Sequence, residues 1–175
     1  DDGTVVWDQT VISPEGRTEL DRLSDIGTQM VIVASDLIVS SYKNRLVSLA
    51  ADSGRLLWFK DISSAGGVVV DRTRLAVSDK EDNLWMLDRR NGSTTWKVDR
   101  MSNRGLTRPA FYGNYVVVGD MEGYLHWLDS DIGAFVARVR AGKKGFAAAP
   151  LTVGTTLYVL TMKGDLVAYR AGAAI

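Results

Sequence analysis

The side chains that could do chemistry are few and regularly spaced. The sequence has one histidine, His126, and no cysteine, which excludes cysteine nucleophiles, thiolate metal sites and disulfides. Aspartates recur between apolar runs, and several are 41 residues apart, as Asp79 is from Asp120 and Asp88 is from Asp129. Such recurrence is typical of aspartates that cap turns and not of a unique active site. A single histidine without neighbouring ligands does not predict a metal site. We therefore expect no catalytic residue, no metal and no cofactor.

Charge and hydropathy exclude two further classes of protein. The 175 residues contain 21 basic and 21 acidic side chains, for a formal net charge of zero. Binding to nucleic acid or to an anionic membrane surface needs a concentrated basic face, which this balance does not favour. No apolar run approaches the ~18 residues that a membrane-spanning helix requires. The composition predicts a globular chain that acts on neither.

The elements that position these side chains come from an internal repeat of about 40 residues. Apolar runs begin at Leu37, Leu75, Val116 and Leu157, in steps of 38, 41 and 41 residues. A Gly-x-x-x-Trp pattern follows the same steps, and its last copy ends in alanine. Its copies are Gly3 to Trp7, Gly54 to Trp58, Gly92 to Trp96, and Gly133 to Ala137.

Each repeat contains four short apolar runs separated by turn residues, which predicts four antiparallel strands and hence one blade of an all-β β-propeller. We expect an outer strand at residues 3–11, an insert loop at 12–27, and blades at about 28–62, 66–99 and 106–140. An incomplete blade follows at 146–170. Because Trp7, Trp58 and Trp96 recur once per repeat, we expect them to dock between adjacent blades and not to bind a ligand.

Two stretches resemble a known family. The repeat of Leu-x-x-Leu-Asp, a turn and Gly-x-x-x-Trp is similar to that of pyrroloquinoline-quinone (PQQ)-type propellers. More specifically, residues 18–25 (TELDRLSD) and 117–128 (VVGDMEGYLHWL) resemble the C-terminal half of the BamB family. These are periplasmic lipoproteins of the outer-membrane β-barrel assembly (BAM) machinery of Gram-negative bacteria. The resemblance covers residues 3–170. It implies an eight-bladed propeller of about twice this length, of which this chain supplies about four blades, with a lipid anchor outside this sequence.

The resemblance also implies a partner. In the BamB family, loops on one face of the propeller bind a periplasmic POTRA domain of BamA, the central barrel protein. The acidic contact position corresponds to Asp25, and a second acidic position two residues later is Gly27 here. The expected partner-binding residues are Asp21, Arg22, Leu23, Asp25 and Gly27. The family further implies guidance of nascent outer-membrane proteins by strand addition. The residues alone are equally compatible with a solvated charged loop.

Two other classes remain as alternatives. Quinoprotein dehydrogenases share the repeat, but they use a calcium site, a catalytic aspartate and often a vicinal disulfide, and this sequence has no cysteine. A WD-type interaction propeller predicts a Gly-His pair and a terminal Trp-Asp in each repeat, whereas this repeat has Leu-Asp and Gly-x-x-x-Trp. Both BamB-like and WD-like classes predict a non-enzymatic scaffold.

Strand counting gives one unpaired strand at the start and one missing strand at the end. The chain is then either an open arc or half of a head-to-tail homodimer that exchanges N-terminal strands.

Overall fold

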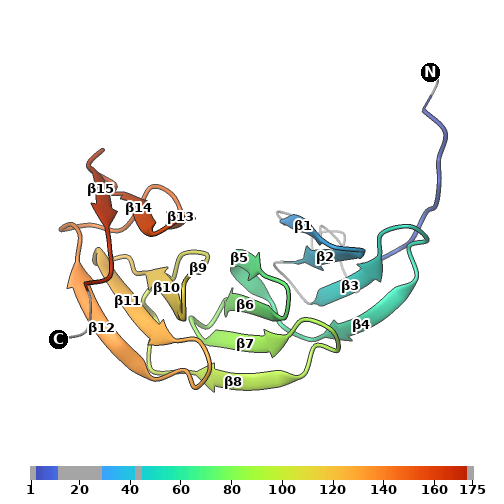
Figure 1. Ribbon diagram of the computed structural model, residues 1–175, viewed down its shortest axis with the longest axis horizontal. Helices are drawn as coiled ribbons and strands as arrows, with labels where there is room; N and C mark the ends of the chain where they lie inside the picture. Colours follow the sequence, from blue (N-terminus) through green and yellow to red (C-terminus); the bar gives the residue numbers. More distant parts are fainter. Residues whose placement is uncertain (1–2, 12–28, 42–44, 173–175) are drawn as a thin grey trace, which may run out of the picture.

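The computed structural model describes residues 3–11, 29–41 and 45–172. Its strands form four antiparallel sheets, each ordered as in the chain (Figure 1). The first sheet contains β1 (Met30–Val33), β2 (Asp36–Ser40), β3 (Leu46–Ala50) and β4 (Leu56–Lys60). The second contains β5 (Ser64–Val70), β6 (Arg74–Asp79), β7 (Leu84–Asp88) and β8 (Thr94–Val98). The third contains β9 (Ala110–Tyr112), β10 (Tyr115–Gly119), β11 (Tyr124–Asp129) and β12 (Phe135–Arg140), and the fourth β13 (Leu151–Val153), β14 (Thr156–Leu160) and β15 (Leu166–Tyr169).

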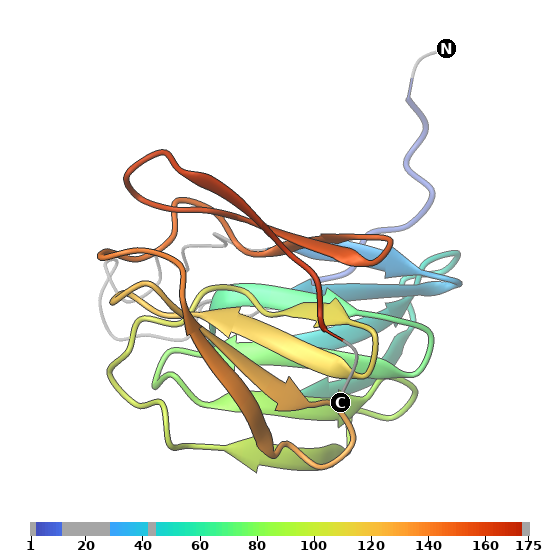
Figure 2. The same ribbon diagram turned by 60° about the vertical axis from the view of Figure 1, so that its left-hand side comes forward.

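The sheets stand side by side around an arc, with β1, β5 and β9 on its inner side and β4, β8 and β12 on its outer rim (Figure 1). Turning the molecule shows the same stacking of sheet upon sheet (Figure 2). This confirms the predicted fold class, an all-β array of about four propeller blades.

The core consists of three apolar layers, one between each pair of neighbouring sheets. Alternation along β10 shows how a middle sheet serves two of them. Val116 and Val118 face the second sheet, whereas Val117 faces the fourth, and all three are fully buried. Successive side chains of a strand point to opposite faces, so a sheet covered on both sides needs a continuous apolar run. The repeated Val- and Leu-rich runs of the sequence meet that need.

Tryptophans of the outer strands join neighbouring sheets. Trp58 of β4 donates its indole N–H to the carbonyl oxygen of Arg89 in the second sheet, at 2.8 Å. Its ring lies against Gly92, where a Cβ atom would approach Trp58 Cε3 to 2.6 Å. Gly92 has a positive φ of 70°, so glycine supplies both the turn and the space for the ring. Trp96 of β8 packs in the same way on Gly133 of the third sheet.

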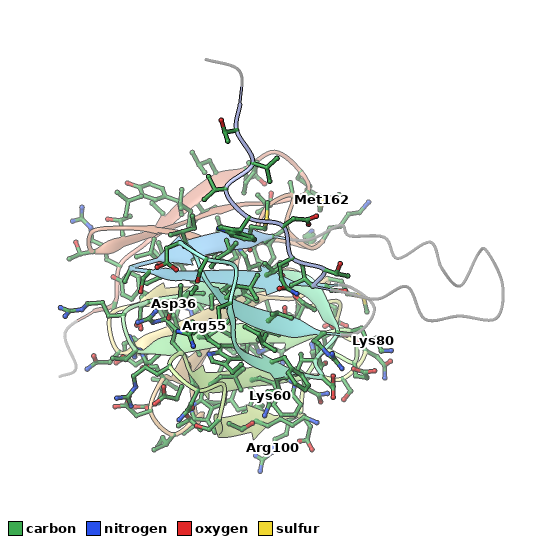
Figure 3. All side chains as sticks on the ribbon, turned by 90° about the vertical axis from the view of Figure 1, so that its right-hand side faces the viewer. Asp36, Arg55, Lys60, Lys80, Arg100 and Met162 are labelled. Carbon is green, nitrogen blue, oxygen red and sulfur yellow. The ribbon has the colours of Figure 1, made fainter. Side chains whose placement is uncertain are left out.

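The two ends of the sheets differ in what they carry. The connections between sheets (61–63, 99–109 and 141–150) and the second turn within each sheet lie at one end, which we call the linker end. The first and third turns of each sheet lie at the other end, the hairpin end. Figure 3 shows Asp36 and Arg55 at the hairpin end and Lys80 at the linker end.

The N-terminal segment differs from the expected strand. Residues 3–11 form no ladder with any described strand, although Trp7 donates its indole N–H to the carbonyl oxygen of Ala51 at 3.0 Å. A strand needs a neighbour to pair with, and the sheet that this segment would extend is not among the described residues. The predicted insert at 12–27 lies outside the described residues.

Candidate functional site

The predicted partner-binding residues, Asp21, Arg22, Leu23, Asp25 and Gly27, lie outside the described residues. The description resumes at Gln29, whose carbonyl oxygen accepts a hydrogen bond from the backbone N–H of Ser40 at 3.3 Å. The side-chain Oε1 of Gln29 accepts another from the N–H of Val68 in the second sheet, at 3.3 Å. The chain that carries the predicted site therefore enters the described fold at the linker end of the first two sheets.

The turn aspartates of the repeat cap their own turns. At the linker end, Oδ1 of Asp79 accepts bonds from the N–H groups two and four residues later, at 3.0 and 2.8 Å. Asp120 does the same at 3.0 and 2.9 Å, and the hydroxyl of Thr161 takes this role in the fourth sheet. Asp88 and Asp129 accept from the N–H two residues later at the hairpin end. These carboxylates hold backbone, as the recurrence of the aspartates predicts.

Asp120 is also the centre of a buried charged cluster. Its Oδ2 lies 2.8 Å from Nη1 of Arg104 and 2.8 Å from Nε2 of His126. Burial by itself raises the pKa of Asp120, but hydrogen bonds from His126, the N–H of Tyr124 and Arg104 outweigh it and leave the pKa below its ordinary value. The same contact raises the pKa of Arg104. The cluster fixes the connection 99–109 against the third sheet.

Sequence reasoning missed the pairing of Asp120 with His126, although the repeat contains the signal for it. Trp85 precedes His126 by 41 residues and therefore holds the same place in its repeat. The indole N–H of Trp85 donates to Oδ2 of Asp79 at 2.7 Å. A ring N–H six residues after the turn aspartate thus satisfies its second oxygen in both sheets.

This arrangement is structural and not catalytic in its chemistry. The oxygens of Asp120 already accept bonds from two N–H groups, a guanidinium and an imidazole. In the part of the chain that the structure describes, no three His, Cys, Asp or Glu side chains are placed to hold a metal ion. Nor do its residues include a helix with the length and apolar character that crossing a membrane would need.

Beside the cluster lies an open hollow of about 460 Å³, between the connection 99–109 and the outer strand β12. Its lining combines guanidinium groups with apolar side chains: Arg100, Met101, Arg104, His126, Phe135, Val136, Ala137 and Arg138. A second hollow of about 510 Å³ adjoins it and shares Arg100 and Phe135. Arginine beside exposed aromatic and aliphatic groups is typical of surfaces that bind polypeptides. The linker end and its outer rim are therefore the candidate interaction surface.

Comparison with known proteins gives the family. A family model described as outer membrane protein assembly factor BamB matches residues 1–98. The chain is 41% identical to outer membrane protein assembly factor BamB of Xanthomonas campestris pv. campestris over 169 residues, which are 97% of this chain and 42% of that protein. It is also 41% identical to the BamB of Pseudomonas aeruginosa over 167 residues, 95% of this chain and 44% of that protein. The chain thus spans less than half the length of these relatives.

Solved structures share the fold. BamB of Moraxella catarrhalis aligns with a TM-score of 0.81 at 24% identity, over 89% of this chain and 46% of that one. The computationally designed Ika4 protein aligns at 0.72 with 13% identity, over 95% of this chain and all of that one. A quinohemoprotein alcohol dehydrogenase of Comamonas testosteroni aligns at 0.66 with 15% identity, over 81% of this chain and 32% of that one. At these identities the enzyme shares the fold alone. By its sequence, the chain belongs to the family of outer membrane protein assembly factor BamB.

Proposed function

We propose that this chain is part of a non-enzymatic scaffold of the outer-membrane β-barrel assembly machinery and binds periplasmic POTRA domains of BamA. Membership in a family of assembly factors is the observation that carries the proposal. The contacts would come from Asp21, Arg22, Leu23 and Asp25, with Gly27 in place of a second acid. The entry of Gln29 at the linker end supports a place for them beside the other connections between sheets.

The scaffold acts by holding its loops in fixed relative positions. Three buried apolar layers and the Trp58 and Trp96 contacts lock each sheet to the next. The Asp120 cluster fixes the connection 99–109 through Arg104. A loop that is already ordered loses little conformational entropy when a partner docks, so more of the contact energy appears as affinity.

Charge reversal at Asp25 tests this proposal. We expect Asp25→Arg to weaken binding to purified BamA periplasmic domains about tenfold or more in a calorimetric titration, because it places like charge against the acid's counterpart. The matched control is Asp131→Arg, at an exposed position of the β11–β12 turn at the hairpin end, which should leave affinity unchanged. Both variants should keep the wild-type circular dichroism spectrum. Equal affinity of Asp25→Arg and the wild type would overturn the assignment of this loop.

The family name supports a place at the outer membrane. We infer that the protein works at its periplasmic face, with any lipid anchor outside this cysteine-free sequence. We also infer contact with nascent outer-membrane proteins at the outer rim, where β12 exposes Phe135, Val136 and Val139. In a light-scattering assay with a urea-unfolded barrel protein, the wild type should slow aggregation and Val136→Asp should slow it less. Equal protection by the two proteins would contradict this role of β12.

A further inference from the structure

The segment 3–11 is held on the first sheet as the outer strands are held on the sheets that follow them. Trp7 donates to the carbonyl oxygen three residues before Gly54, at 3.0 Å, and its ring lies over that glycine. Trp58 and Trp96 make the same two contacts with the second and third sheets. Those two tryptophans belong to the fourth strand of a sheet, whereas the residues around Trp7 form no ladder with a described strand. Trp7 therefore marks a fourth strand that is docked on the next sheet and has no sheet of its own here.

The fourth sheet lacks the corresponding strand. It contains β13, β14 and β15, and among the described strands β15 pairs with β14 alone. The strands at the same place in the other sheets, β3, β7 and β11, each pair with an outer neighbour, β4, β8 and β12. The outer edge of β15 is thus open for one more antiparallel strand.

The faces at the two ends of the arc are apolar and exposed. On the fourth sheet, the face turned away from the third exposes large side chains, of which Leu166 is 70% exposed. The others are Leu151, Val153, Tyr158 and Leu160. On the first sheet, Met30 and Ile32 are exposed on the face turned away from the second. Val5 and Val6 of the unpaired segment are 78% and 83% exposed. Contiguous apolar surface of this kind marks a contact with another body.

We propose that two copies of this chain close head to tail, each adding its segment 3–11 to β15 of the other. Within one copy the N-terminal segment and β15 lie at opposite ends of the arc, so they do not meet (Figure 1). Two copies would supply every missing strand and would cover both apolar faces, because each fourth sheet would pack on the first sheet of the partner. The contact is heterologous and closes after two copies, which leaves no free edge for further growth. This inference is independent of BamA binding.

The repeat gives the register of the added strand. Ser48 of β3 lies opposite Trp58, and Met86 of β7 lies opposite Trp96. The equivalent position of β15 is Ala168, which should lie opposite the partner's Trp7. Two residues further along the segment, the partner's Gln9 should then lie opposite Leu166, as Lys60 lies opposite Leu46 in the first sheet.

Because the chain has no cysteine, introduced cysteines report this register directly. A mixture of Gln9→Cys and Leu166→Cys single variants should oxidise to a covalent heterodimer on a non-reducing gel, since a disulfide requires Cα atoms about 4.4–6.8 Å apart. The matched control is a mixture of Gln9→Cys with Leu151→Cys. Leu151 is also exposed, but it lies on β13, two strands from β15.

Multi-angle light scattering of the unmodified chain gives the second readout. We expect a mass of about twice 19.1 kDa at micromolar concentration. A monomer at the highest soluble concentration would overturn the proposal. A dimer whose Leu151→Cys mixture crosslinks as well as the Leu166→Cys mixture would overturn the strand exchange. BamA binding is not part of either measurement, so its failure would leave this result readable.

Discussion

Trp127 lies directly opposite Ala137 in the pairing of β11 with β12, the reverse of the arrangement in the sheets before it. In the first two sheets the outer strand carries the tryptophan, opposite Ser48 or Met86 of the strand inside it. In the third sheet the indole has moved one strand inward and the outer position is alanine. The space between the third and fourth sheets is thus filled from β11, where Trp127 is almost fully buried.

The exchange changes the polar contacts of this interface. Nε1 of Trp127 is buried and has no hydrogen-bond partner among the described residues. Tyr112, whose ring meets Trp127 edge-on at 5.1 Å, supplies the polar link to the fourth sheet instead. Its hydroxyl donates to the carbonyl oxygen of Thr155 at 2.6 Å and accepts from the N–H of Ala171 at 3.0 Å.

This difference predicts unequal costs for the same substitution. Trp58→Phe and Trp127→Phe remove the same atoms from equally buried sites, but only Trp58→Phe breaks a hydrogen bond and leaves the carbonyl oxygen of Arg89 without its donor. We expect Trp58→Phe to lower the free energy of unfolding by about 1 kcal/mol more than Trp127→Phe. Urea denaturation followed by circular dichroism measures both. Equal losses would mean that the indole N–H of Trp58 contributes nothing.

Alanine at the docking glycine should cost more than alanine at a free turn glycine. Gly92 and Gly113 both have positive φ, at 70° and 56°. A Cβ at Gly92 would meet the ring of Trp58 at 2.6 Å, whereas none of the described atoms lies within 4 Å of a Cβ at Gly113. We expect Gly113→Ala to lower stability by about 1–2 kcal/mol, from backbone strain alone. Gly92→Ala should lower it by about 3 kcal/mol or more, because Trp58 must also move. Similar melting temperatures of the two variants would contradict the docking role.

Neighbouring arginines at one turn should differ in their contribution. Arg89 pairs with the largely buried Asp36 of the first sheet and donates to the carbonyl oxygens of Arg72 and Val33. Arg90 pairs only with Asp88 on the surface. We expect Arg89→Met to lower the free energy of unfolding by about 2–4 kcal/mol, since it leaves a half-desolvated carboxylate unpaired. Arg90→Met should be indistinguishable from the wild type by thermal unfolding. A large loss in both would mean that the shared turn, and not the inter-sheet pair, is sensitive.

The Asp120 cluster should make stability depend on pH in a defined direction. The pKa of Asp120 is lowered in the folded chain, so the carboxylate stabilises the fold above its unfolded pKa of about 3.9. That contribution is lost as the pH falls through the lowered folded value. We expect Asp120→Asn to cost about 3 kcal/mol at pH 7. The difference from the wild type should shrink on acidification below about pH 4.

Comparing the two proteins isolates this group. Asp71, whose pKa is also lowered despite its burial by hydrogen bonds from Thr73 and Arg74, is present in both and cancels. Urea midpoints of wild type and Asp120→Asn at pH 7, 5 and 3 provide the measurement. A difference that stays constant across this range would show that the charge of Asp120 has no role in stability.

The sequence predicts the fold well because the fold is repetitive. Each strand of a sheet occurs at the same place in every repeat, so the 38- and 41-residue steps reveal strands that single segments would leave ambiguous. The tryptophan-to-glycine spacing likewise survives in three copies. The pairing of Trp127 with Ala137 was harder to foresee, because one substitution had to be read together with another on the neighbouring strand.

The Asp120 cluster lies beyond such reasoning for a different reason. Arg104 comes from the connection 99–109, which has no counterpart of equal length between the first two sheets. Without a register, nothing in the sequence brings that guanidinium to Asp120. The ladder at residues 3–11 depends on a partner strand that local sequence cannot supply, and residues 12–28 lie outside the described chain.

The tryptophan contacts also bear on how such a chain can change its length during evolution. Each one links a residue to the corresponding glycine of the next repeat and to nothing further along the chain. Duplicating or deleting one whole repeat would therefore recreate every contact at the new junction without a compensating substitution. A gene encoding this unit can gain or lose a blade in a single recombination step, and only the closure of the ring would select which number of blades is kept.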